Sequence, residues 1–120
     1  MFDGDPDHPI LEKPWTYDIA SIAYHHDLGD WRGSYVDLTL VRGPVVRRLR
    51  FLIPSDFEIE KGFPHGNPGL RILDVRRRQL EDINIRVDNV DEPSGGAVRF
   101  WAREVVDLDE GVPHRIDAGR

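Results

Sequence analysis

The chain of 120 residues contains no cysteine and a single methionine. Without cysteine there can be no disulfide, no zinc site built on thiolates and no thiol nucleophile. Long apolar runs are also lacking, since no stretch reaches the roughly 18 apolar residues of a membrane-spanning helix. The first residues have neither the basic start nor the apolar stretch of a secretory signal. These absences predict a cytoplasmic protein with no membrane partner.

Recognisable catalytic motifs are missing as well. The sequence has no Gly-x-Ser-x-Gly elbow and no glycine-rich phosphate loop. Its formal net charge of −6 argues against nucleic acid as a partner, because binding to a phosphate backbone needs an excess of Lys and Arg. Because these motifs are missing, we expect no cofactor. Whether the protein is an enzyme stays open, and a protein without enzymatic activity is the favoured interpretation. The motifs identify no family.

Alternating apolar residues are the main positive signal. The clearest run is residues 35–41, where Val36, Leu38 and Leu40 alternate with polar neighbours, which is typical of a half-buried strand. Similar alternation predicts strands in residues 45–53, 57–60, 70–75, 83–87 and 97–106. Residues 17–24 fit a strand with Ala20, Ile22 and Tyr24 on one face, and a short helix is the alternative.

Short strands separated by turn residues, with no long helical pattern, are typical of an all-β protein. We predict a single small antiparallel β-sandwich or open barrel of about seven strands, with at most one short helical segment. The predicted organisation has three parts: an acidic, Pro-rich N-terminal arm (1–16), a β-rich domain (17–108) and a C-terminal tail (109–120).

Charged residues on two successive predicted strands suggest a ladder. Arg48 and Arg50 share one face of residues 45–53, and Glu58 and Glu60 share one face of residues 57–60. Across a tight turn these pairs would face each other and fix the strand register.

Histidines and a carboxylate cluster in the loop that follows residue 24. His25, His26 and Asp27 carry groups that ligate metals or act as general bases near neutral pH. Adjacent histidines in an extended chain point to opposite faces, so a shared ion would need a turn there and a further ligand such as His65. A metal site at His25, His26, Asp27 and His65 is one hypothesis, and a solvated loop is the alternative.

An aromatic residue held between Gly62 and Pro64 marks the loop of residues 62–69. Loops of this kind often carry binding residues. If Phe63 is exposed, it would anchor a partner, with His65, Trp31 and Trp101 as further interaction candidates. If Phe63 folds back onto the sheet, the loop only connects two layers.

The leading functional hypothesis is a small acidic, non-catalytic interaction domain of bacterial style, which binds a protein partner, as an immunity-type protein does, or forms a homo-oligomer. One alternative is a metal-dependent or acid/base enzyme that uses the histidines. The other is a β-barrel that binds a small ligand in its mouth. The sequence specifies neither the partner nor the oligomeric state.

Overall fold

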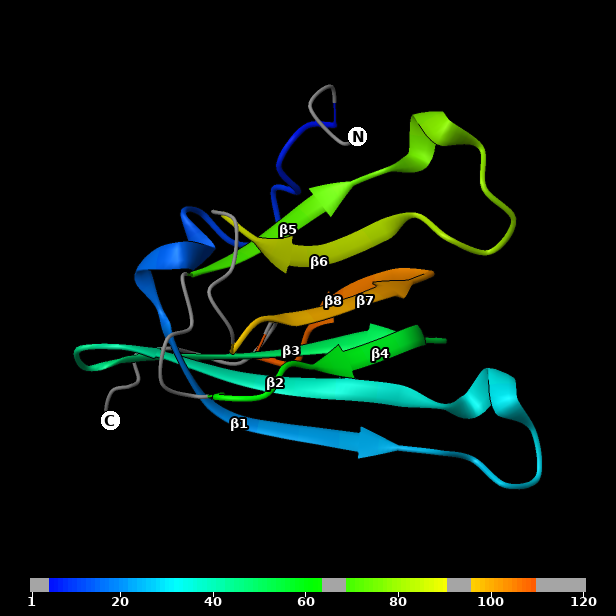
Figure 1. The fold of residues 1–120 in the computed structure, drawn as a ribbon, viewed down its shortest axis with the longest axis horizontal. Helices are drawn as coiled ribbons and strands as arrows, with labels where there is room; N and C mark the ends of the chain where they lie inside the picture. The colour runs from blue at the N-terminus through cyan, green and yellow to red at the C-terminus, as the bar shows by residue number, and fades with distance from the viewer. Residues whose placement is uncertain (1–4, 64–68, 91–95, 110–120) are drawn as a thin grey trace.

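The alternating segments form eight β-strands in two four-stranded antiparallel sheets (Figure 1). The computed structural model describes residues 5–63, 69–90 and 96–109. The strands are β1 (Asp18–His25), β2 (Tyr35–Arg42), β3 (Val45–Leu52), β4 (Ser55–Ile59), β5 (Leu70–Asp74), β6 (Ile85–Asn89), β7 (Val98–Ala102) and β8 (Glu104–Asp107). One sheet has the order β1-β2-β3-β8 and the other β4-β7-β6-β5. The prediction of a small all-β sandwich is confirmed.

Helical structure in the described ranges is limited to three short 3-10 turns, η1 (Pro14–Thr16), η2 (Trp31–Gly33) and η3 (Arg76–Arg78). No helix there is long and apolar enough to cross a membrane.

The core lies between the two sheets and follows the predicted alternation. Val36, Leu38 and Leu40 of β2 are fully buried. Phe51 of β3 meets Phe100 of β7 edge to face, with ring centroids 5.1 Å apart. Because these two strands belong to different sheets, this aromatic pair directly joins the layers.

Two corners, where the chain passes from one sheet to the other, were not predicted. The run expected as one strand over residues 97–106 is divided at Arg103 into β7 and β8, which belong to different sheets. The second corner lies between β3 and β4, at Ile53, whose φ is +53°. The division at Arg103 raises the strand count from the predicted seven to eight.

The corner between β3 and β4 makes the predicted charge ladder wrong. Strand β3 pairs with β2 and β8, whereas β4 pairs with β7. Arg50 therefore forms its ion pair with Asp37 of β2, at 2.8 Å. Glu60 pairs with Arg99 of β7, at 3.0 Å. After β3 the chain therefore passes into the other sheet instead of forming a hairpin.

Residues near the N-terminus cover the outer edge of β5. The amide of His8 donates to Ile72 O at 2.8 Å, and the amide of Asp74 donates to Pro6 O at 2.9 Å. Asp5 is buried, with its carboxylate bound by Arg78 at 2.6 Å. This edge of the second sheet is therefore occupied by the chain itself.

Candidate functional site

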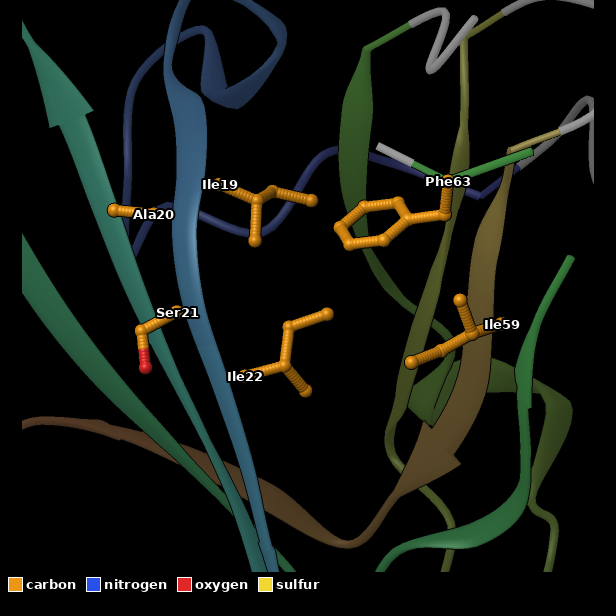
Figure 2. A pocket seen from close by; sticks show the side chains of 6 residues that line it. All are labelled: Ile19, Ala20, Ser21, Ile22, Ile59 and Phe63. Atoms are coloured by element: carbon orange, nitrogen blue, oxygen red, sulfur yellow. The ribbon is translucent and has the colours of Figure 1, made fainter. Parts of the chain in front are cut away.

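An apolar groove lies between β1 and β4, the edge strands of the two sheets. Its volume is about 300 Å³, and its apolar lining comes from Ile19 and Ile22 of β1, Ile59 of β4 and Phe63. Figure 2 shows Ile19 and Ile22 directed across the gap toward Ile59 and Phe63, with Ala20 and Ser21 on the opposite side of β1. The groove therefore brings together side chains that are about 40 residues apart in sequence.

A β-bulge explains how β1 contributes two isoleucines to this groove. The pairing of β1 with β2 shifts register between Ile19 and Ser21. The extra residue lets Ile19 and Ile22 face the same side, although strict alternation would separate them. Residues 17–24 thus contain the predicted strand, but Ala20 is exposed and Ile19 takes the inward place expected for it.

An aromatic contact joins the two edge strands beyond the groove. Tyr24 of β1 meets Phe57 of β4 edge to face, with ring centroids 5.2 Å apart. Phe57 in turn packs on Phe100 of the core at 5.4 Å. The edges are thus held together by side chains here, while the described pairings give β1 only one neighbour, β2.

The predicted interaction residues lie in different parts of the fold. Phe63 is half-buried, packs against the core and lines the groove. Trp31 is 54% exposed and lies in η2. Trp101 is half-buried in β7, with the Arg86 guanidinium 4.5 Å from its ring centre. His65 lies outside the described residues. Of these four candidates, the described part places only Phe63 at the groove.

The side chains of the histidine loop have separate contacts. The ring of His25 stacks on Tyr35 at 4.8 Å. Nδ1 of His26 is 3.5 Å from Oγ of Ser34. Within the described ranges no three His, Cys, Asp or Glu side chains are grouped so that they could hold a metal ion. Since His65 lies outside those ranges, the full four-residue metal hypothesis stays a prediction.

Asp27 organises this loop. Its carboxylate accepts hydrogen bonds from the amides of Gly29 at 2.9 Å and Asp30 at 3.1 Å. The bonds from the amides of Asp30 and Gly29 lower the pKa of Asp27, because they stabilise its charged form. A Cβ on Gly33 would lie 2.2 Å from Oδ2 of Asp27, so the carboxylate sits directly against that glycine. These contacts account for Asp27 as a loop-forming residue.

Sequence reasoning missed the β1 and β4 members of the groove, Ile19, Ile22 and Ile59, because the groove depends on which edges lie side by side. The one available signal was Phe63, an aromatic held between Gly and Pro. Comparison of the chain with protein-family models, with curated proteins and with solved structures finds no match.

Proposed function

We propose that this protein is a non-catalytic interaction domain that binds an extended segment of a partner protein along β1. The observation that carries the proposal is the edge of β1 beside the apolar groove, which no strand in the described residues pairs with and which we call the open edge. In this binding mode, backbone hydrogen bonds to an unpaired strand edge give affinity and pockets for alternate side chains give specificity. The proposal keeps the cytoplasmic location expected from the sequence.

The four sheet edges differ in how well they would accept a strand. Residues 6–8 occupy the edge of β5. Strand β8 has only four residues, and β4 has five with a register shift between Ser55 and Glu58. Short strands and bulges are devices that prevent pairing at an edge. Strand β1 has eight residues, and none between Ile19 and Tyr24 is charged or proline. Its bulge lies near its start and leaves residues 21–25 in regular pairing.

The groove supplies the side-chain part of such a site. Its volume of about 300 Å³ is at the lower end of the range for ligand pockets, about 300–1,000 Å³, and suits one or two apolar side chains. Ile59 is 43% exposed, so the groove leaves apolar surface in contact with water. A partner strand paired with β1 would place alternate side chains over this surface.

The charge of the chain favours a basic partner. At a net charge of −6, two copies repel each other, whereas a positively charged protein is attracted and its association is accelerated. The expected ligand is thus an extended segment with alternating apolar residues on a basic protein. Self-pairing of β1 in a homodimer is the competing arrangement, and sedimentation equilibrium distinguishes it from the monomer that we expect.

The proposal can be tested with a library of random decapeptides displayed on phage. Selected peptides should show alternating apolar residues, and a synthetic copy should shift the amide NMR signals of residues 19–24 and of Ile59. Ala23→Lys places a charge on the open edge, and Ile59→Ser removes an apolar wall of the groove. Each should weaken binding about tenfold, the scale expected from losing one well-packed contact.

Val106→Ser is the matched control, because Val106 of β8 is 39% exposed, close to the 43% of Ile59, and lies outside the groove. This variant should bind the peptide as the original chain does. The proposal is overturned if no peptide is selected, if the shifted signals lie away from β1, or if the protein sediments as a dimer through β1.

A further inference from the structure

A second hollow, of about 500 Å³, lies where η2 meets the two corners between the sheets. Its walls come from the loop after β1, from the end of β3, from the corner between β7 and β8, and from the residue before β6. The main contributors are Arg32, Ser34, Leu52, Ile53, Asn84 and Arg103. None of these residues lines the groove between β1 and β4.

Most arginines in the described ranges are bound to carboxylates. The whole chain has 22 acidic residues against 16 Lys and Arg, so carboxylates are in excess. Of the twelve arginines described, nine form an ion pair with a described Asp or Glu and three do not. The nine are Arg47, Arg48, Arg50, Arg71, Arg76, Arg77, Arg78, Arg86 and Arg99.

The three remaining arginines are Arg32, Arg42 and Arg103. Arg42 is engaged elsewhere: it donates to Thr16 Oγ1 at 2.9 Å, and its guanidinium lies 4.5 Å from the ring centre of Tyr17. Arg32 and Arg103 have no carboxylate partner among the described residues, and both line the second hollow. In an acid-rich chain, two such guanidiniums at one concave site are a natural place for an external anion.

The guanidinium of Arg32 is positioned by a neighbouring ring. It lies 5.5 Å from the ring centre of Trp31, within the range of a cation–π interaction. A guanidinium has five N–H donors, and a cation–π contact does not consume them. Arg32 can therefore stay beside Trp31 and still donate to an oxyanion.

One carboxylate, that of Glu104, also lines the hollow. It is bound by Arg76 in a side-chain hydrogen bond that raises the pKa of this guanidinium. Glu104 therefore already has a cationic partner outside the lining. Its charge still offsets part of that of Arg32 and Arg103, which favours a ligand with a single negative charge over a polyanion.

An apolar wall faces these charges. The carbonyl oxygen of Leu52 accepts a hydrogen bond from the backbone amide of Arg103 at 2.8 Å. The backbone amide of Ile53 donates to the carbonyl oxygen of Ser34 at 3.0 Å. Ile53 has φ +53°, a left-handed conformation that β-branched residues rarely adopt and that is concentrated at functional sites. These bonds hold Leu52 and Ile53 beside Arg103 despite that conformation.

We infer that this hollow binds a small monocarboxylate with an apolar body. The guanidiniums of Arg32 and Arg103 hold the carboxylate, and Leu52 and Ile53 contact the apolar part. The site shares no lining residue with the groove at β1, so it does not rest on the proposed function.

Sodium benzoate is the probe, titrated into the ¹⁵N-labelled protein at constant ionic strength, with sodium phosphate in a parallel titration. Benzoate should shift the amide signals of Gly33, Ser34 and Ile53 in a saturable way, and phosphate should bind more weakly. Arg32→Gln and Arg103→Gln should each weaken benzoate binding about tenfold, as expected from losing a charge-assisted hydrogen bond.

Arg42→Gln is the matched control, since Arg42 also lacks a carboxylate partner among the described residues but lies outside the hollow. It should leave benzoate affinity unchanged. Arg32 and Arg103 are exposed, so their variants should keep the amide dispersion of the folded protein. The inference is overturned if benzoate causes no saturable shift, if phosphate binds as tightly, or if Arg42→Gln weakens binding as much as the other two substitutions.

Discussion

Removing the ring of Phe100 should destabilise the fold more than almost any other single truncation. Phe100 is fully buried, and its ring centroid lies 5.1 Å from that of Phe51 and 5.4 Å from that of Phe57. It therefore contacts β3 of the other sheet and the edge strand β4 of its own sheet. Phe→Ala substitutions in cores cost about 3–5 kcal/mol. A chain of 120 residues is expected to have a free energy of unfolding of about 6–15 kcal/mol. Phe100→Ala should therefore remove a large fraction of it.

Urea unfolding followed by tryptophan fluorescence would measure this loss. The variant should unfold at a lower urea concentration with an unchanged slope. Because Phe51 and Phe100 are in contact, the cost of the double alanine variant should fall short of the sum of the two single costs, by about 0.5–1.5 kcal/mol. Val106→Ala, at a position 39% exposed, should change stability by at most about 0.5 kcal/mol. A cost for Phe100→Ala below about 1 kcal/mol would refute the assigned packing between the sheets.

Three further predictions concern pH, a glycine and a buried carboxylate. Burial lowers the pKa of His8 below its ordinary value of 6.5, so on acidification this side chain takes up a proton in the unfolded state before it does so in the folded state. The free energy of unfolding should therefore fall as the pH drops below 6.5 toward the folded-state pKa. In urea unfolding measured across this pH range, His8→Gln should make that dependence on pH weaker. Gly33→Ala should lower the melting temperature, because its Cβ would lie 2.2 Å from Oδ2 of Asp27. Asp5→Asn should cost about 1–3 kcal/mol in urea unfolding, since its carboxylate is 4% exposed and bound by Arg78.

Each of these predictions has a control. Gly29→Ala should be tolerated better than the alanine at position 33, because its nearest neighbouring atom is 3.5 Å away. Arg77→Gln should change stability by about 0.5 kcal/mol or less, since this side chain is 62% exposed and 3.8 Å from Asp5. Equal effects within either pair, or a pH profile that His8→Gln leaves unchanged, would contradict the assigned contacts.

The strands were predictable where one face is buried and the other is wet. In β2, Val36, Leu38 and Leu40 are buried and their neighbours are not. The period of two that this burial imposes is directly visible in the sequence. The edge strand β1 was harder to assign as strand or helix, because its bulge interrupts that period between Ile19 and Ser21.

The assignment of strands to sheets was not predictable in the same way. A turn between two strands has similar residues whether it closes a hairpin or passes to the other layer. A tight turn was expected between residues 45–53 and 57–60, but the chain passes into the second sheet at Ile53, which has a left-handed conformation. The residue type at position 53 gives no signal of this conformation, because isoleucine disfavours positive φ. The charge ladder was wrong for this reason.

The candidate sites depend on the same information. Phe63 was identified because its flanking Gly and Pro mark a loop, which is a local signal. Ile59, which faces β1 in the groove, had no local signal that distinguished it from any apolar strand residue. Arg32 and Arg103 could not be singled out either, because only the folded structure shows that the described carboxylates pair with other arginines.

Both proposed sites follow from how this chain forms a sandwich. The second hollow lies where the two corners meet, because the amide of Arg103 at one corner donates to Leu52 O at the other. The groove lies where β1 and β4, edges of different sheets, approach without backbone pairing. Substitutions at the corners should therefore affect anion binding and leave strand addition intact, whereas substitutions on β1 should do the reverse. Peptide titrations with and without benzoate test this independence, because coupling between the two sites would change the affinity for the peptide.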